Sequence, residues 1–379
     1  MPLKDILYRT LRAIAQLRAQ RDEPNCILVL QYLLPLGGCV HATPMYAALR
    51  RSLPHLPVYV VTRGLGAQVL RHNPDIAGIL ETPDAFTSLH AAGRSLARQL
   101  REHKLVPAWI VTDATNRRSS LALLGALYVH APLVGYNLAA SLQTVSLALD
   151  KSESMLANNL AIAAAIGAGA QHIEPRIFFS TADANDARSL LRSINPDGLP
   201  IAIFSTQSSG GQPSQWHEDR FQAVIAAIAE RGLLPVCVGT ADQSSAIDAL
   251  RSAVDVATAS LAGKTDISTL AAVLALSDLC ISIDTGTMHL ARAVGVPLVV
   301  LAPTYQPAIE WLPLDLPQAR VLRGGGTAPV PPTYRLDEVH VPAVLAAVED
   351  LLTAFPPSAA SREARVAALT NSVTHQATS

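Results

Sequence analysis

A carboxylate, two hydroxyls and an imidazole stand close together in the sequence at Asp284, Thr285, Thr287 and His289. They follow a short apolar run, residues 280–283, which is typical of a strand buried on both faces, and they precede apolar residues at helical spacing. A strand-to-helix turn of this kind presents free backbone N–H groups and the positive end of a helix dipole, which suits a phosphate group. Asp284 or Thr285 could instead be a plain N-cap of the helix.

The residues that follow define the elements around this turn. Gly295 and Pro297 end the helix, and residues 298–302 form a second buried strand. His289 lies about one turn into the helix, so we expect it to face the same crevice as the turn.

Length and composition favour two domains, because the chain has 379 residues and half of them are apolar. The net charge of −1 argues against a general nucleic-acid-binding surface, so nucleic acid is not an expected partner. The four cysteines are scattered in apolar runs without the spacing of a metal site, which indicates buried free thiols in a reducing compartment. They are Cys26, Cys39, Cys237 and Cys280.

Alternating strands and helices run through both halves of the chain. In the first half we expect strands at residues 26–32, 58–62, 79–80, 108–112 and 133–136. In the second half we expect them at residues 201–205, 234–238, 280–283, 298–302 and 320–322. This alternation predicts an α/β protein with two Rossmann-like doubly wound domains, residues 25–180 and 195–355, facing across a ligand cleft. The polar stretch 181–200, with a turn at 195–198, marks the boundary between them.

The two ends of the chain differ from its middle. Residues 1–24 predict an amphipathic helix, which could lie on an anionic membrane surface through residues 1–22 or pack on its own domain. Charges interrupt its apolar residues too often for a secretory signal or a membrane span. Residues 356–379 are rich in Ala, Ser and Thr, which favours a disordered tail.

Four motifs together resemble the lipopolysaccharide heptosyltransferases of glycosyltransferase family nine. They are LGG-x-VH-x-TP at 36–44, QW-x-x-x-RF at 215–221, GKTDISTLA at 263–271 and DTGTMHLARAVGVPLVVLAPT at 284–304. The resemblance covers residues 26–307. It implies the GT-B fold, a nucleotide-activated heptose as donor (typically the ADP sugar), inversion at the anomeric carbon, and no metal or other cofactor. The sequence contains no D-x-D metal motif, in agreement with the last point.

The resemblance implies that the second domain binds the donor. The turn at 284–286 and His289 would stabilise the leaving diphosphate, and the loop 205–211 would add hydroxyls and N–H groups, although a bare solvent loop is an alternative. Gly239 and the residues at 264–265 would line the nucleobase and ribose. The complete expected donor set is Ser205, Thr206, Ser209, Gly239, Lys264, Thr265, Asp284, Thr285, Gly286 and His289. A P-loop is rejected at 263–265, because Thr258 stands where its first glycine should be.

The first domain is expected to bind the acceptor, which in this family is an anionic lipid-linked saccharide. Guanidinium groups pair bidentately with carboxylate and phosphate, although an ordinary solvated surface explains each arginine equally well. The expected acceptor set is Gly37, Gly38, Arg63, Arg117 and Arg118.

Two positions depart from the family pattern. An acidic residue that serves as catalytic base is expected where this chain has Gly38, and a basic residue where it has Ser214. Either His41 or Asp113 could be the base instead, or the chain is a weakly active or inactive member that binds a nucleotide sugar or a partner protein. The expected function is therefore an inverting, metal-independent glycosyltransferase that modifies a bacterial surface saccharide. We expect it in the cytoplasm, either free or peripheral on the inner membrane.

Overall fold

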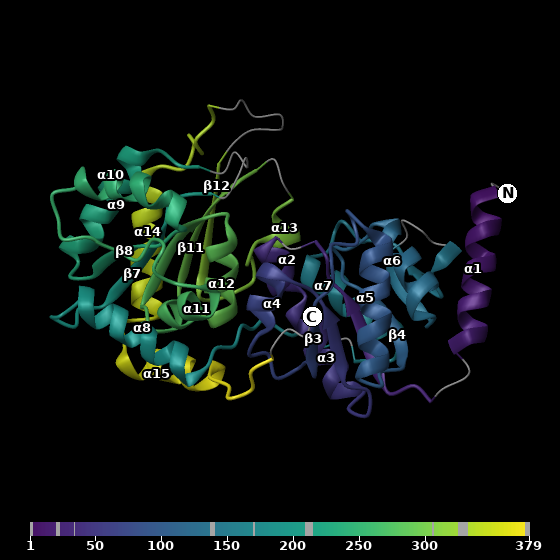
Figure 1. The fold of residues 1–379 in the computed structure, drawn as a ribbon. Coiled ribbons are helices and arrows are strands. Elements are labelled where there is room, and N and C mark those ends of the chain that lie inside the picture. The colour runs from purple at the N-terminus through teal and green to yellow at the C-terminus, as the bar shows by residue number, and fades with distance from the viewer. Residues whose placement is uncertain are drawn as a thin grey trace. The chain divides into compact units, whose positions relative to one another are not determined.

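The computed structural model describes residues 3–19, 23–33, 35–136, 141–169, 171–208, 215–304, 307–324 and 333–375. It divides into two compact units (Figure 1). The first unit comprises Met1–Arg176 and Val373–Ser379, and the second comprises Ile177–Ser372. The change from one unit to the other thus lies just ahead of the polar stretch at 181–200.

The first unit is built on a six-stranded parallel sheet with the order β3-β2-β1-β4-β5-β6. The strands are β1 (Cys26–Leu30), β2 (Val58–Val61), β3 (Gly78–Leu80), β4 (Pro107–Thr112), β5 (Leu133–Tyr136) and β6 (Val145–Leu147). The helices are α1 (Leu3–Ala19), α2 (Leu36–His41), α3 (Thr43–Ser52), α4 (Gly64–Leu70), α5 (Leu89–Glu102), α6 (Ser119–Leu124), the π-helix η1 (Gly125–Val129) and α7 (Met155–Ala165).

The second unit repeats this plan with the order β12-β11-β10-β7-β8-β9. Its strands are β7 (Ile201–Ser205), β8 (Leu234–Cys237), β9 (Ala259–Ser260), β10 (Leu279–Ile283), β11 (Leu298–Pro303) and β12 (Ala319–Gly324). Its helices are α8 (Thr181–Ile194), α9 (Glu218–Glu230), the 3₁₀-helix η3 (Ala241–Gln243), α10 (Ser244–Ser252), α11 (Ile267–Ala275), α12 (Gly286–Val294), α13 (Ala308–Trp311), α14 (Val341–Ala354) and α15 (Ala359–Leu369).

The strand order reverses direction once in each sheet. The reversal lies between β1 and β4 in the first unit and between β7 and β10 in the second. Ligands of doubly wound sheets bind beyond the carboxyl ends of the strands at such a switch point. Each unit therefore has one defined place where a ligand site is expected.

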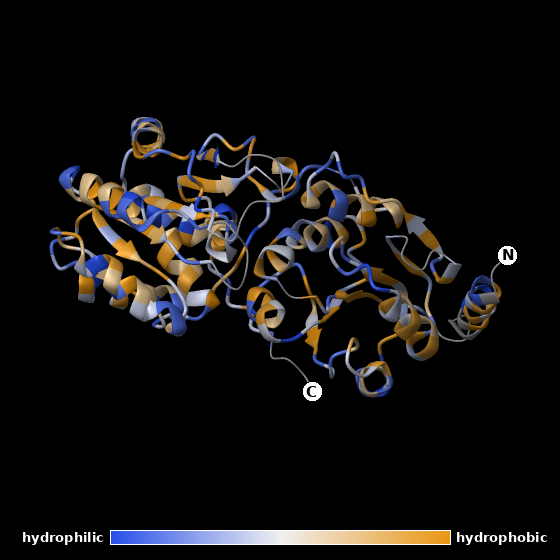
Figure 2. Ribbon diagram, turned by 90° about the horizontal axis from the view of Figure 1, so that it is seen from above, coloured by the Kyte–Doolittle hydropathy of each residue, from blue (hydrophilic) through white to orange (hydrophobic). Residues whose placement is uncertain are grey.

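The predicted α/β architecture is confirmed in both units. All five residues of β1, β7 and β10 are buried, as expected for strands covered on both faces. Figure 2 shows strands in the interior of each unit in the colours of hydrophobic residues. The short edge strands β6 and β9 were not predicted, because they have only three and two residues and are partly exposed. The four cysteines are buried and free, also as predicted.

Two local features were not expected from the sequence. The polar stretch after residue 180 forms α8, whose first turn is closed by a reciprocal capping box between Ser180 and Asp183. This helix buries only Ala184, Ala187 and Leu191, so its apolar stripe is narrow and easily read as a linker. The glycines at 37–38 do not form a turn but lie inside a helix, α2, which begins at Leu36.

The predicted disordered tail is wrong over α15. This helix packs Val366 and Leu369 into the second unit. Arg362 donates to both carboxylate oxygens of the buried Asp278, at 2.7 and 2.8 Å. A buried carboxylate is costly without a partner, so this ion pair stabilises the docked helix. Composition alone cannot show that a polar helix supplies the missing partner; residues 376–379 lie outside the described residues.

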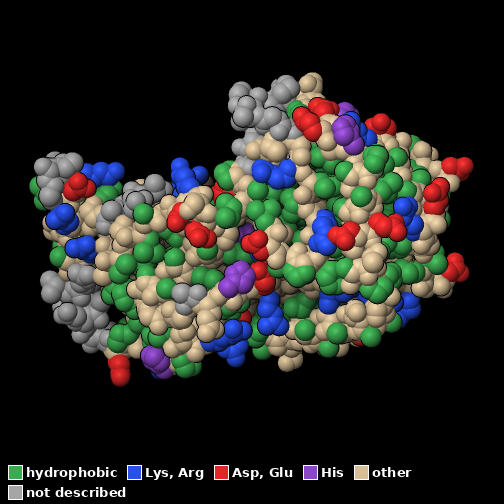
Figure 3. All heavy atoms as spheres, turned by 180° about the vertical axis from the view of Figure 1, so that it is seen from behind, with side chains coloured by type: hydrophobic (Ala, Val, Ile, Leu, Met, Phe, Trp, Pro, Cys, Tyr) green, Lys and Arg blue, Asp and Glu red, His purple; other side chains and the backbone are tan. Residues whose placement is uncertain are grey.

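Charged groups elsewhere are evenly distributed. Figure 3 shows acidic and basic side chains interspersed with apolar ones over the face that it presents, in keeping with the small net charge. Among the described residues no single helix is long and apolar enough to cross a membrane, although α14 and α15 pass together on length and composition with an 85° bend.

Candidate active site

The switch point of the second unit collects hydroxyl groups around one carboxylate. Ser282 of β10 pairs with Ser205 of β7, so the residues that follow these two parallel strands emerge side by side. The hydroxyls of Ser205 and Thr285 lie 3.4 Å apart. The structure therefore brings together Ser205, Thr206, Asp284 and Thr285, all of which belong to the predicted donor set.

Helix α12 begins at this point, with Gly286 as its first residue. Its N-cap, Thr285, has an extended backbone (φ −148°, ψ 175°), and its side chain makes no capping hydrogen bond in the described chain. The plain N-cap interpretation therefore does not hold for Thr285. Thr206 is only 4% exposed, and its hydroxyl finds no hydrogen-bond partner among the described residues. An unpaired buried hydroxyl is costly, which suggests that a ligand completes it.

Burial shifts the pKa of both Asp284 and His289. Desolvation raises the pKa of the Asp284 carboxyl. Desolvation and the nearby Arg292 guanidinium lower the pKa of His289 to about 3. The His289 ring also meets the ring of Trp311 edge to face, with centroids 6.0 Å apart. A neutral His289 can form a hydrogen bond with the expected nucleotide-sugar donor, but it cannot form an ion pair with it.

The depressed pKa of His289 predicts a specific loss of stability in acid. Its contribution is present above about pH 6.5 and is lost as the pH falls towards 3, because the unfolded chain then binds a proton that the folded chain refuses. Between pH 7 and pH 5 the wild type should lose about 2 kcal/mol that His289→Gln does not lose. Urea unfolding of both proteins at the two pH values measures this difference. Equal losses would show that His289 is not held neutral.

The remaining donor candidates lie at the adjacent strand ends. The Gly239 carbonyl accepts a hydrogen bond from the Gly263 N–H at 2.9 Å, which joins the loops after β8 and β9. A side chain on Gly239 would approach Ile247 Cδ1 to 2.6 Å, so tight packing already explains this glycine. Lys264 is exposed, and its ammonium group lies 3.3 Å from the Ser260 carbonyl oxygen. Thr265 follows it in the same loop, half-buried, whereas Ser209 lies outside the described residues.

In the first unit, Asp113 lies at the switch point but is fully engaged. One carboxylate oxygen accepts hydrogen bonds from the Thr115 N–H and hydroxyl and from the Asn116 N–H. The other accepts from the side-chain amides of Gln31 and Asn116. The group is completely buried, and desolvation raises its pKa. This arrangement braces the loop after β4 rather than offering a free base.

Two asparagines that the motif analysis missed extend this brace. The Asn116 side-chain oxygen accepts from the Tyr32 and Leu33 N–H groups, at 2.7 and 2.6 Å, and so fixes the chain between β1 and α2. Asn159 accepts from the Ala114 N–H and donates to the His41 carbonyl. A buried asparagine inside the otherwise apolar helix α7 was the available signal.

If Asp113 is a brace, Asp113→Asn should unfold the protein more easily. The new side-chain amide would point its N–H groups at the side-chain N–H groups of Gln31 and Asn116, and these donors would then lack an acceptor. We expect a loss of about 3 kcal/mol in the free energy of unfolding, measured with urea. Asp150→Asn is the matched control, because the exposed Asp150 makes the same kind of bonds to Ser152 N–H and hydroxyl. An Asp113→Asn protein as stable as this control would contradict the brace.

Gly38 and His41 belong to the same short helix, α2, with His41 as its last residue. A Cβ on Gly38 would stand 3.3 Å from both Pro35 Cγ and Thr115 Cγ2, which is tight. Gly37 and Gly38 are both buried in α2. His41, the last residue of α2, is also buried, and its carbonyl accepts the bond from Asn159 at 2.9 Å. Asn159 thus joins the backbone of His41 to that of Ala114, the residue after Asp113, and neither of the two expected bases is exposed.

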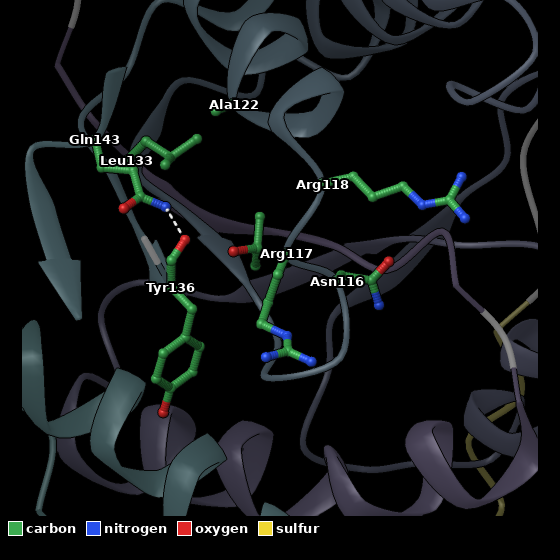
Figure 4. A pocket seen from close by; sticks show the side chains of 8 residues that line it. Asn116, Arg117, Arg118, Ala122, Leu133, Tyr136 and Gln143 are labelled. Carbon is green, nitrogen blue, oxygen red and sulfur yellow. Dashed lines mark hydrogen bonds between the residues drawn. The ribbon is translucent and has the colours of Figure 1, made fainter. Parts of the chain in front are cut away.

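The expected acceptor arginines do not form one cluster. Arg63 pairs with Asp84 at 3.0 Å and lines an open cavity of about 610 Å³ together with Arg98. Arg118 places its guanidinium 4.4 Å above the Phe86 ring, two residues from Asp84. Figure 4 shows Arg117 extending between Tyr136 and Asn116, whereas Arg118 extends the other way. Arg63 and Arg118 therefore both contact the loop 84–86, whereas Arg117 lies apart from it.

The departure at Ser214 lies outside the described residues, but the neighbouring tryptophan is well defined. Trp216 is buried, donates its indole N–H to the Val339 carbonyl at 2.8 Å and meets Phe221 edge to face. The sequence interpretation of this residue as packing is confirmed.

Comparison with known proteins supports the predicted family. Residues 94–310 match the sequence model of glycosyltransferase family 9 (heptosyltransferase). No curated protein matches the chain in sequence.

Three solved structures illustrate the similarity in fold. A glycosyltransferase family 9 protein from Veillonella parvula has a TM-score of 0.76 at 19% identity, over 87% of this chain and 98% of its own. ADP-heptose lipopolysaccharide heptosyltransferase II of E. coli has 0.70 at 20% identity, over 87% and 99%. E. coli heptosyltransferase WaaC with ADP has 0.65 at 15% identity, over 87% and 98%. These matches confirm the predicted GT-B architecture of two doubly wound units.

Proposed function

The chain belongs to glycosyltransferase family 9 and is a glycosyltransferase, and from this we propose that it transfers heptose from ADP-heptose to a lipopolysaccharide-type saccharide. The donor class is suggested by the similar E. coli proteins, one named for ADP-heptose and one determined with ADP. The proposal includes inversion of the anomeric carbon and a reaction that needs no metal.

One observation carries the donor site. The amino-terminal end of α12, the paired hydroxyls of Ser205 and Thr285 and the buried Thr206 hydroxyl, which has no partner among the described residues, meet at the switch point of the second unit. Free N–H groups at a helix start and buried hydroxyls suit a diphosphate, whose negative charge grows as the sugar leaves. The neutral His289 adds a hydrogen-bonding group without adding positive charge.

The chemistry requires one proton transfer. An acceptor hydroxyl forms a bond to the anomeric carbon, the bond from that carbon to the diphosphate oxygen breaks, and ADP leaves with the electron pair. A general base must take the hydroxyl proton. Asp113 already accepts five hydrogen bonds, so we assign this role to His41, whose imidazole suits proton transfer near neutral pH.

The acceptor is proposed to bind through the first unit. Arg63 and Arg118 flank the 84–86 loop beside an open cavity, which suits the carboxylates and phosphates of an anionic saccharide. Because that saccharide is lipid-linked, we place the reaction in the cytoplasm at the surface of the inner membrane.

A second candidate is a slow or inactive member that only binds its nucleotide sugar or a partner protein. It is favoured by the crowded Gly38, where the family has its acid, and by the burial of both remaining bases.

Calorimetry followed by a transfer assay separates the two candidates. Wild-type protein should bind ADP more tightly than UDP or GDP. It should release ADP from ADP-heptose when given heptose-deficient lipopolysaccharide, at the same rate with or without EDTA, and NMR of the product should show an inverted anomeric centre. Tight ADP binding without release on any such acceptor would favour the inactive candidate. Preference for another nucleotide would overturn the proposed donor.

A further inference from the structure

Helix α1 attaches to the first unit by its polar side. The Ser141 hydroxyl donates to the Asp5 carboxylate at 3.0 Å, and the Arg12 guanidinium donates to the Gln143 carbonyl at 2.9 Å. Tyr8 and Leu11 lie against the core between these contacts and are partly buried. Asp5, Tyr8 and Arg12 recur at helical spacing, so they define one face of α1.

The opposite face of α1 is apolar and points to solvent. Ile6, Leu7 and Ile14 are 49%, 55% and 43% exposed, and exposed Thr10 lies between them at helical spacing. They are three of the nine large hydrophobic residues that are exposed in the described chain. A fourth, Leu127 at 40%, lies on η1, the element against which α1 packs. Amphipathic helices normally bury the apolar face, so this orientation is inverted.

Basic residues accompany this apolar face. Helix α1 contains four basic residues and one acidic residue, in a chain whose net charge is only −1. The single acid, Asp5, is turned towards Ser141. Lys4 and Arg9 are exposed. Figure 2 shows hydrophobic and hydrophilic residues sharing this helix at the N-terminal end of the chain.

We propose that α1 docks the protein onto the surface of an anionic lipid bilayer, with the face formed by Ile6, Leu7, Thr10 and Ile14 inserted at the boundary between headgroups and acyl chains. An apolar stripe flanked by Lys and Arg is what such a surface selects. The polar contacts of Asp5 and Arg12 hold the helix on the first unit while its apolar face stays available.

A second copy of the chain fits this face less well. A two-fold contact between two α1 helices would use the same face of both copies, so the basic residues that flank this face in one copy would lie beside those of the other. Like charges so placed repel each other, whereas anionic headgroups neutralise them. The inference rests on the proposed function only in that a lipid-linked acceptor gives bilayer binding a purpose.

Vesicle sedimentation with the full-length protein tests the inference without any transfer reaction. Wild type should bind vesicles of phosphatidylcholine with roughly 30–40% phosphatidylglycerol, because that lipid composition supplies the negative surface potential required. It should sediment much less with phosphatidylcholine alone, and salt should partly release it from the anionic vesicles. Ile6→Glu and Leu7→Glu should each weaken vesicle binding about tenfold, since each removes an apolar side chain that the bilayer would bury. Lys4→Glu should weaken it about fivefold or more.

Leu314→Glu is the matched control, because Leu314 is equally exposed, at 46%, but belongs to the second unit. It should bind as wild type does, and circular dichroism should show all variants folded. Equal binding by wild type, Ile6→Glu and Leu7→Glu would overturn the inference. So would a wild-type dimer in light scattering that Leu7→Glu converts to monomer. ADP binding should be unchanged in every variant, which keeps failure here distinct from failure of the proposed function.

Discussion

Gly286→Pro should weaken ADP binding by about 10- to 100-fold without unfolding the protein. Gly286 is the first residue of α12, and proline there removes one backbone N–H from the helix start. Proline is well tolerated at the first helical position, and the preceding Thr285 already has the extended backbone that proline demands. A lost hydrogen bond to a charged phosphate accounts for the expected factor. Calorimetry with ADP measures it.

Gly286→Ala is the control for crowding, since alanine adds a Cβ but keeps the N–H. It should bind ADP much more tightly than Gly286→Pro does, and both should melt near the wild-type temperature. If proline and alanine weaken binding equally, the N–H group is not a ligand of the phosphate. If neither weakens it, the diphosphate does not bind at this helix.

His41→Ala should lower turnover by about 10²- to 10⁴-fold while leaving ADP affinity unchanged. This is the range expected when a general base is removed. The rate of the variant should depend on pH differently from that of the wild type, because the proton-accepting group has been removed. Single-turnover transfer over a pH series, with ADP affinity measured alongside, separates the role of a base from a structural one.

Unchanged turnover in His41→Ala would exclude this base and favour the slow-member candidate. Gly38→Asp then becomes informative, because it restores the family's acid. Its Cβ needs room beside Pro35 and Thr115, so we would combine it with Thr115→Ser, which removes Cγ2 but keeps the hydroxyl bonded to Asp113. A faster double variant would identify Gly38 as the reason for slow catalysis.

The central strands could be predicted because their burial leaves a direct trace in the sequence. Residues 298–302 are apolar without interruption and residues 280–283 are apolar except for Ser282, and both runs lie in strands of a parallel sheet. Gly295 ends α12 in the left-handed conformation, with φ +76°, as the pattern indicated. Elements held by polar contacts were missed for the opposite reason. Helix α15 depends on the pairing of Arg362 with Asp278, two residues far apart in the chain.

The candidate site shows the same contrast between features that sequence patterns predict and features that depend on distant contacts. The motif residues around Asp284 could be predicted to lie together, because a strand, a turn and a helix follow one another directly in the chain. Asp113 was read as a base because a carboxylate ends a strand, but its hydrogen bonds from Gln31 and Asn116 arise only in the folded unit. The same holds for Asn159, which joins the Asp113 loop to α2 from a distant helix. Residue spacing in the sequence does not reveal hydrogen bonds between such distant residues.

The most direct test of the account is a crystal structure of the protein with ADP. We expect diphosphate oxygens to accept hydrogen bonds, at about 3 Å, from the backbone N–H groups at the start of α12 and from the Thr206 hydroxyl. ADP bound with its diphosphate elsewhere, for example against Arg63 in the first unit, and with Thr206 still unpaired, would contradict it.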